Sequence, residues 1–453
     1  MNIAVIMAGG FGTRLFPLSR TNYPKQFLRI FDNKSLLSLT YERVKNLDIF
    51  DEVWVCANKK HLFLIKRDIE DIEHKMILEE ESKNTAFAIL LSVFRINDFH
   101  KRENNFVFFP SDHFIFNDLE FNKTMQNLVN YLCKYEKTFV IGVKPSFPST
   151  EYGYIKKGKS IDESLYVVER FIEKPNLGKA KYYYKSKNYL WNSGIYAFNS
   201  EFFISDFFQI NHDLNKFAFL GDLLGKSKDF PNISIDYLYS QKSKNLVVLE
   251  SSFGWSDLGS FEEIGKIANN NKEKVIELES AGYNVIVDEF EALSEKKYCL
   301  IDVKDLVVVD TKDFLLISKK GKSKKIANVL GSITQEKRDF NSFDFRPWGY
   351  YREIEKLDKY RIKHIVVYPK QELSLQYHNH RDEYWVVLRG KGRVFLDKEW
   401  IEISEGDFIR IPKGNLHKVI NEADEYLEII EVQIGNILSE QDIVRVEDKY
   451  MRD

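Results

Sequence analysis

The sequence predicts three consecutive regions: an α/β domain over residues 1–265, a small β-rich connector over 266–339 and an all-β barrel or sandwich over 340–453. In the first region, apolar runs of strand length alternate with helical patterns, whereas the last region contains only short strands separated by Gly and Pro. A length of 453 residues, of which 44% are hydrophobic, suffices for two or three folded domains.

Four apolar runs near the N-terminus are typical of buried strands: NIAVIMA (2–8), EVWVCA (52–57), NFVFFP (105–110) and TFVIGV (138–143). Between them lie three segments with apolar residues at helical spacing: SLLSLTYERVKNL (35–47), HLFLIKRDIEDI (61–72) and NTAFAILLSVFRI (84–96). This alternation predicts a parallel sheet with helices on both faces. Ligands of such sheets bind beyond the carboxyl ends of the strands.

The rest of the chain is predicted to be richer in β structure. Residues 146–265 are aromatic and less regular, and we expect them to complete the first domain. The connector contains NVIVDEF (284–290) and DLVVVDTKDFLLIS (305–318). The last region contains IKHIVVY (362–368), YWVVL (384–388), DFIRIP (407–412) and YLEIIEVQI (426–434). Short strands that recur between turns predict an all-β fold there.

Composition excludes several classes of protein. The 66 basic and 68 acidic residues leave a net charge of −2. A protein that binds nucleic acid or membrane surfaces in general would carry an excess of basic residues, so this balance argues against both classes. Cys56, Cys133 and Cys299 lie far apart and match no metal or redox spacing. No apolar stretch approaches the ~18 residues of a membrane span. We therefore expect a cytoplasmic protein that binds neither nucleic acid nor membrane.

A glycine-rich segment directly follows the first strand. Gly9, Gly10 and Gly12 would let backbone N–H groups approach phosphate oxygens, while Arg14 adds a bidentate cation and Lys25 a point charge. The segment lacks the third glycine of a dinucleotide fingerprint and the Gly-Lys-Ser/Thr of a P-loop. Taken alone, it is equally consistent with a purely structural turn.

Further motifs follow this segment, GGFGTRLFPLSRTNYPKQFL (9–28), in a fixed order: NTA (84–86), PSDH (110–113), EYGYI (151–155), FIEKP (171–175), WNSG (191–194) and WSDLG (255–259). Together they resemble the signatures of sugar-1-phosphate nucleotidyltransferases, in particular the mannose-1-phosphate guanylyltransferase branch. The resemblance implies a Rossmann-like domain that transfers GMP from GTP to mannose 1-phosphate. The product, GDP-mannose, would supply polysaccharide synthesis.

The resemblance also implies roles for individual residues. Asp112 and Asp257 would hold Mg²⁺ and act as catalytic residues together with Arg14 and Lys25. The implied nucleotide-binding residues are Gly9, Gly10, Gly12, Thr13, Arg14, Lys25, Asn84, Thr85 and Asp112, and the implied sugar-phosphate residues are Gly153, Glu173, Lys174 and Asn192. Two structural alternatives stay open. Asp112 could cap the next helix, and Lys174 could be an ordinary surface lysine. Phe87 departs from the proline that the family usually carries there.

Two histidine-containing blocks mark the C-terminal region, QYHNHRDE (376–383) and GDFIRIPKGNLH (406–417). Strand alternation would place Gln376, His378 and His380 on one face. The blocks resemble the paired motifs of cupin barrels, and the Gln-x-His opening resembles cupin-type phosphomannose isomerases. Residues 340–453 as a whole resemble the type II phosphomannose isomerase domain, which in bifunctional enzymes is fused to a guanylyltransferase.

This second resemblance implies a divalent metal, Zn²⁺, Mn²⁺ or Co²⁺, held by Gln376, His378, Glu383 and His417, with His380 as a competing ligand. The domain would interconvert mannose 6-phosphate and fructose 6-phosphate through an enediol. Arg381 and Arg445 match family positions and would be catalytic, although structural ion pairs explain them equally well.

The sequence thus predicts a bifunctional enzyme, for which a homodimer is one possible state. One alternative is a guanylyltransferase whose cupin domain is a non-catalytic binding or oligomerisation module. Others are a transferase for another nucleotide or hexose, and a nucleotide-sensing regulator without turnover.

Overall fold

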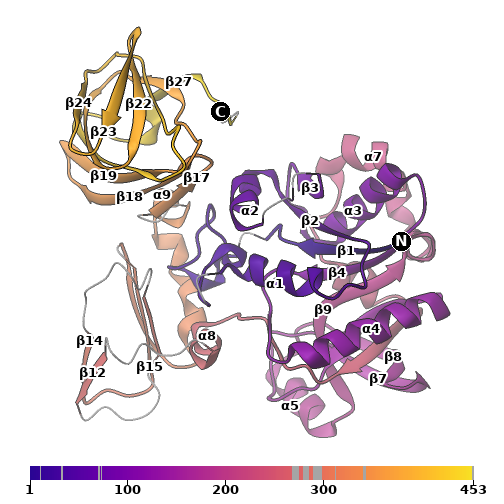
Figure 1. Ribbon diagram of the computed structural model, residues 1–453. Coiled ribbons are helices and arrows are strands. Elements are labelled where there is room, and N and C mark those ends of the chain that lie inside the picture. The colour runs from indigo at the N-terminus through magenta and orange to yellow at the C-terminus, as the bar shows by residue number, and fades with distance from the viewer. Residues whose placement is uncertain are drawn as a thin grey trace. The chain divides into compact units, whose positions relative to one another are not determined.

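A computed structural model describes the chain except residues 11, 32–33, 70–71, 73, 268–274, 279–284, 289–297, 312, 340–342 and 451–453. The chain forms two compact units (Figure 1). The first contains residues 1–311 and 315–331, and the second contains 312–314 and 332–453. The strands of the connector are therefore grouped with the first unit, and the three-part division at 265 and 339 stays a prediction.

In the described part of the first unit, nine strands form one sheet in the order β3-β2-β1-β4-β9-β6-β10-β8-β7. Their bounds are β1 Asn2–Met7, β2 Glu52–Asn58, β3 Met76–Glu79, β4 Asn105–Pro110, β6 Thr138–Val143, β7 Tyr154–Asp162, β8 Leu165–Ile172, β9 Tyr189–Asn199 and β10 Leu246–Ser251. The four strands predicted near the N-terminus, β1, β2, β4 and β6, are confirmed.

The sheet is mixed, whereas the sequence predicted a parallel one. Strands β3, β2, β1 and β4 run parallel, as do β6 and β10, but β9 lies antiparallel between β4 and β6. The alternation rule failed here because it used only the first 145 residues, and β9 enters the sheet from the later aromatic segment. That segment does complete the first domain, since β7 to β10 all belong to this sheet.

Helices lie on both faces of this sheet (Figure 1). The described helices of the first unit are α1 Leu36–Lys45, α2 Leu62–Asp68, α3 Asn84–His100, α4 Asp118–Lys134, α5 Leu177–Ser186, α6 Ser200–Ile210, α7 Leu220–Gly225 and α8 Phe261–Ile267, of which α8 contacts the connector strand that begins at Val285. The three predicted helices are confirmed as α1, α2 and α3, and α2 ends earlier than its pattern suggested. Capping explains where α1 begins, because the side chain of Ser35 accepts a hydrogen bond from the Ser38 N–H (3.0 Å).

The described strands of the connector are β12 Val275–Leu278, β13 Val285–Asp288, β14 Tyr298–Ile301, β15 Leu306–Asp310 and β16 Leu315–Lys319. The segment after β16 is attached to α8, because the Glu262 carboxylate accepts from the Gly321 N–H (2.7 Å) and the Ser323 hydroxyl (2.6 Å). Within the ranges that the structure describes, no helix is long and apolar enough to cross a bilayer.

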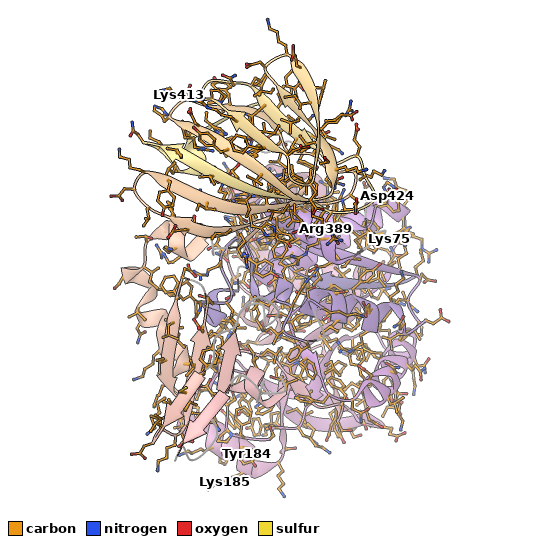
Figure 2. The ribbon with its side chains drawn as sticks, turned by 60° about the vertical axis from the view of Figure 1, so that its left-hand side comes forward. Lys75, Tyr184, Lys185, Arg389, Lys413 and Asp424 are labelled. Atoms are coloured by element: carbon orange, nitrogen blue, oxygen red, sulfur yellow. The ribbon has the colours of Figure 1, made fainter. Side chains whose placement is uncertain are left out.

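The second unit contains a short helix, α9 Gln335–Asp339, and two facing sheets with the strand orders β17-β18-β19-β26-β21-β24 and β23-β22-β25-β20-β27. Their bounds are β17 Phe343–Arg346, β18 Gly349–Lys356, β19 Tyr360–Val367, β20 Leu375–His378, β21 Arg381–Arg389, β22 Lys391–Leu396, β23 Glu399–Ser404, β24 Phe408–Ile411, β25 His417–Ile420, β26 Leu427–Gly435 and β27 Ile443–Glu447. Trp385, Val394 and Ile429 belong to the hydrophobic core of this unit, and the all-β fold predicted for this region is confirmed. Figure 2 shows Lys413 at one end of this barrel and Arg389 at the other.

Candidate active sites

The glycine-rich segment lies beyond the carboxyl end of β1, and the buried side chain of Gln26 fixes its backbone. The Gln26 amide nitrogen donates to the carbonyl oxygens of Ala8 (2.9 Å) and Gly10 (2.7 Å). Gly12 has φ +48°, and a Cβ there would lie 2.6 Å from the backbone nitrogen of Lys25. Only glycine fits so close to the following segment. Thr13 begins a 3₁₀ turn, Thr13–Leu15, but its side chain lies outside the described part.

Two loops meet beside this segment because two short strands, β5 Phe114–Ile115 and β11 Trp255–Ser256, pair antiparallel. Asp112 precedes β5 and Asp257 follows β11, so both carboxylates lie at the same end of the ladder. The Trp255 indole N–H also donates to His113 Nδ1 (3.1 Å), which ties the loops together.

Lys25 joins the two predicted metal-binding residues. Its ammonium lies 2.8 Å from Asp112 Oδ2 and also donates to the Asp257 carbonyl oxygen. Arg14 Nη1 lies 4.0 Å from Asp257 Oδ2, and the Arg14 side chain is 60% exposed. Burial disfavours the charge of Asp112, but the Lys25 ammonium outweighs it and lowers the pKa of this carboxyl to about 2. The structure therefore brings all four predicted catalytic residues of the first site together.

Asp257 is oriented by residues that the sequence did not single out. The Tyr152 hydroxyl lies 2.9 Å from both Asp257 Oδ1 and Glu263 Oε1. The Gly259 N–H donates to Asp257 Oδ1 (3.1 Å) and to Glu263 Oε2 (2.7 Å). Burial and these two carboxylates raise the pKa of Tyr152, so its hydroxyl remains a donor. Asp257 Oδ1 thus accepts two hydrogen bonds from the protein, whereas Asp257 Oδ2 faces Arg14.

The predicted sugar-phosphate residues also lie together. A Cβ on Gly153 would lie 2.5 Å from Glu173 Oε2 and 3.4 Å from the Asn192 Cβ. The Asn192 N–H donates to the Gly153 carbonyl (2.9 Å), and Lys174 Nζ lies 2.7 Å from Glu173 Oε1. Lys174 has φ +46°, an uncommon conformation for a residue with a side chain.

Asp236 is a further member of this group that sequence reasoning missed. It begins a π-helical segment, Asp236–Ser240, and its Oδ1 accepts from the Asn192 amide (3.0 Å) and the Tyr196 hydroxyl (2.7 Å). Burial, together with the Asp236 charge, raises the pKa of Glu173. Helical irregularities of this kind often accompany functional sites, but no sequence pattern indicated this one.

Asn84 and Thr85 lie at the start of α3. Asn84 has φ +69° and accepts from the Thr85 N–H through its side chain (2.9 Å). The Thr85 hydroxyl accepts from the Ile235 N–H (2.9 Å) and therefore ties α3 to the segment before Asp236. Phe87 is buried against Phe230.

The second site is a buried cluster of His378, Glu383 and His417 on three strands of the barrel. His378 Nε2 lies 2.9 Å from Glu383 Oε1, and His417 Nε2 lies 3.7 Å from Glu383 Oε2. The possible ligand atoms all lie within 4.8 Å of one another. Gln376 is paired with His417 in the β20–β25 register, and its amide oxygen accepts from the Ser374 hydroxyl (2.8 Å).

The protonation of His417 suits a metal ligand. Its Nδ1 lies 3.0 Å from the Asn415 carbonyl oxygen, which favours a proton on Nδ1, and its buried Nε2 has no hydrogen-bond partner among the described residues. Burial lowers the pKa of His417 to about 4, although Glu383 opposes this, so the imidazole is neutral at pH 7. A neutral imidazole with a free Nε2 lone pair beside a carboxylate fits a divalent cation.

His380 differs from its prediction. The alternation of faces stops because β20 ends at His378, and the His380 side chain is 51% exposed with Nδ1 2.7 Å from Asp442 Oδ1. Arg381 is instead buried, with Nε 3.1 Å from Glu383 Oε1. Arg445 pairs with Gln376 in the β20–β27 register and lines the same cavity as Arg381, Glu383 and Gln376.

Comparisons with known proteins show to which families the two regions of the chain are similar. The nucleotidyl transferase family model matches residues 3–274, and the mannose-6-phosphate isomerase C-terminal model matches 334–448. Mannose-1-phosphate guanylyltransferase of Salmonella montevideo is 33% identical over 476 aligned positions, covering 99% of each chain. The chain belongs to the mannose-1-phosphate guanylyltransferase family.

Other members of the guanylyltransferase family show the same full-length match. The Escherichia coli relative named mannose-1-phosphate guanylyltransferase is 31% identical over 100% of both chains. Among solved structures, one described as mannose-1-phosphate geranyltransferase from Thermus thermophilus is 26% identical, with a TM-score of 0.62 over 73% of this chain and 98% of its own.

One buried acid of this guanylyltransferase-family chain has no role in the motifs above. Glu79 is the last residue of β3 and is 2% exposed. Its Oε1 has no hydrogen-bond partner among the described residues, and burial raises its pKa to about 7. A Cβ on Gly9 would lie 2.5 Å from its Oε2. Because Glu80 and Glu81 follow it directly, the sequence alone did not distinguish Glu79 from two further acidic residues.

Glu79→Gln is expected to stabilise the free protein at pH 8 by about 2 kcal/mol, because an amide is cheaper to bury than an unpartnered carboxylate. The raised pKa of Glu79 means that folded-state stability is lost as the pH rises from 4.5 to about 7. The gain should therefore fall to about a quarter of this value at pH 5. Thermal unfolding at both pH values, with exposed Glu80→Gln as control, measures it. An equal shift at both pH values would contradict the assignment.

Proposed function

We propose that the first unit transfers GMP from GTP to mannose 1-phosphate, releasing pyrophosphate and forming GDP-mannose. The observation that carries this proposal is the convergence of Lys25, Arg14, Asp112 and Asp257 beside the glycine-rich segment. A sugar 1-phosphate oxygen is already anionic, so attack on the α-phosphorus requires no general base. Positioning and neutralisation of charge then supply the catalysis.

Asp112 and Asp257 would hold Mg²⁺, an ion that takes one or two protein carboxylates and fills its other positions with phosphate oxygens and water. When bound, it would neutralise charge that develops on the phosphates. Lys25 and Arg14 would bind the triphosphate, and the glycine backbone N–H groups would approach its oxygens. The Tyr152 hydroxyl and the Gly259 N–H donate to Asp257 Oδ1 and would orient this carboxylate.

The acceptor would bind next to Gly153. Lys174 would pair with the phosphate of the incoming sugar. The Glu173 carboxylate would accept hydrogen bonds from the sugar hydroxyls, and the Asn192 amide would donate to them. Asp236 would orient the Asn192 amide through the bond that joins them. We propose Asp236 as a positioning residue.

A pyrophosphate-release panel tests the transferase proposal. GTP, ATP, UTP and dTTP are each combined with mannose, glucose and galactose 1-phosphates in the presence of Mg²⁺. We expect release with GTP and mannose 1-phosphate at least about tenfold above the other pairs. A different preferred pair would reassign the substrates. GTP binding without any release of pyrophosphate would favour the alternative of a nucleotide-sensing regulator.

We further propose that the second unit isomerises mannose 6-phosphate and fructose 6-phosphate with a divalent Zn²⁺, Mn²⁺ or Co²⁺. The buried cluster of His378, Glu383 and His417 beside two arginines supports this proposal. Such an ion, bound by these ligands and Gln376, would stabilise negative charge on the enediol oxygens. Arg381 and Arg445 would bind the phosphate or the enediolate.

Feeding fructose 6-phosphate to the protein with each metal tests the isomerase proposal. Formation of mannose 6-phosphate supports it. If no aldose phosphate forms at any metal concentration, the barrel is a binding or oligomerisation module. A homodimer, a cytoplasmic location, the lack of nucleic-acid and membrane partners and a role in polysaccharide supply stay predictions.

A further inference from the structure

We propose that Glu79 selects guanine by accepting hydrogen bonds from the N1–H and the 2-amino group of the base. The inference rests on the proposed guanylyl transfer and adds to it the residue that recognises the nucleotide. Its basis is the position of an unpartnered, buried carboxylate beside the glycine-rich segment.

Glu79 lies on the same edge of the sheet as the proposed phosphate site. It ends β3 and pairs in register with Asn58, the last residue of β2, while Gly9 follows β1, the next strand of the sheet. The Ser82 hydroxyl donates to the Gly9 carbonyl (3.3 Å) and accepts from the Asn58 amide (3.2 Å). The segment after Glu79 is therefore attached to the glycine-rich segment.

The positions of Lys25 and Glu79 suggest how a bound nucleotide would be oriented along the glycine-rich segment. Lys25 contacts Asp112 on one side of the glycine-rich segment, and the Glu79 carboxylate faces Gly9 on the other. A nucleotide whose phosphates lie at Lys25 and whose chain follows the glycines would place its base near β3. A side chain at residue 9 would fill the space against the carboxylate, so glycine there keeps Glu79 accessible from the segment.

The chemistry of the carboxylate matches one base. Guanine presents two adjacent donors, N1–H and the 2-amino group, which a carboxylate can accept with its two oxygens. Adenine and cytosine present a ring acceptor at the corresponding position, and uracil and thymine present only one donor between two carbonyls. A buried charge without a partner is costly, and two donors from the ligand would relieve that cost. Burial also explains why the pKa of Glu79 is raised to about 7 in the free protein.

The neighbouring Glu80 supplies a matched control. It follows Glu79 directly, its side chain is 73% exposed, and it forms an ion pair with Lys59. Its replacement changes the same formal charge at almost the same place in the chain, but away from the proposed base contact.

The test compares GTP with ITP, whose base retains N1–H but lacks the 2-amino group. Wild-type protein and the variants Glu79→Gln and Glu80→Gln are assayed for kcat/KM with mannose 1-phosphate and for nucleotide Kd by calorimetry. The wild type should prefer GTP over ITP by about tenfold or more. Glu79→Gln should weaken GTP by roughly 10- to 100-fold, because its amide nitrogen would oppose the 2-amino group. It should weaken ITP much less, since the Gln oxygen still accepts from N1–H.

The expected signature is therefore a GTP/ITP ratio that falls towards one in Glu79→Gln and is unchanged in Glu80→Gln. An unchanged ratio in folded Glu79→Gln would overturn the inference. If the wild type binds GTP without turnover, the transferase proposal fails, while the Kd ratios still decide the role of Glu79. If the wild type binds no GTP at all, both proposals fall.

Discussion

Replacing Asp257 by Asn is expected to abolish nucleotidyl transfer and leave the fold intact. The amide keeps the size of the side chain, and its oxygen can still accept from the Tyr152 hydroxyl and the Gly259 N–H. What is lost is the negative charge that would hold Mg²⁺. Because metal binding is worth several kcal/mol of transition-state stabilisation, we expect pyrophosphate release to fall by about 10³-fold or more.

The measurement is pyrophosphate release with saturating GTP and mannose 1-phosphate across a Mg²⁺ titration, with circular dichroism and melting temperature as controls of folding. Asp229→Asn, at an exposed position, is the matched control and should retain wild-type activity. Full activity of Asp257→Asn would remove this carboxylate from the metal site.

If the barrel holds the proposed metal and isomerises hexose phosphates, replacing His417 by Gln is expected to weaken metal binding and reduce isomerisation. The variant removes the buried imidazole whose Nε2 has no partner among the described residues. Loss of one ligand from the proposed four-ligand set should weaken metal binding by at least about 100-fold, because even supporting residues outside a ligand set cost about 10- to 100-fold. Guanylyl transfer should change by less than about twofold, since independent sites seldom couple.

Metal content measured on the purified protein, followed by both activity assays, tests this expectation. His364→Gln is the control, because His364 pairs with Glu428 (3.1 Å) outside the cluster. Retention of metal and isomerase activity by His417→Gln would show that the imidazole of His417 is not required for metal binding. Metal loss accompanied by unchanged isomerisation would instead separate the metal from the reaction.

Local patterns predicted the first half of the sheet well. Strands β1, β2, β4 and β6 are short apolar runs whose side chains are buried on both faces, so composition alone identifies them. Strand β9 is equally buried, but its antiparallel entry between β4 and β6 depends on long-range pairing. No local period contains that information.

The site residues divide in the same way. Residues inside motifs, such as Lys25 and Asp112, were identified because their neighbours resemble a known family. The roles proposed for Glu79 and Asp236 depend on tertiary contacts between segments far apart in the chain, and no spacing rule connects those segments. His380 shows the opposite failure, because strand alternation was extended past the residue where the strand ends.

The contact between Lys25 and Asp112 has a consequence for how the enzyme rests between turnovers. The Lys25 ammonium serves as an internal counter-ion of the Asp112 carboxylate and lowers its pKa to about 2, so this carboxylate is already paired with a cation. At the proposed magnesium site, an incoming ion would therefore compete with the tethered ammonium of Lys25 for this carboxylate. Binding of the proposed metal would then be an exchange of cations, in which the displaced ammonium would become available to the arriving triphosphate.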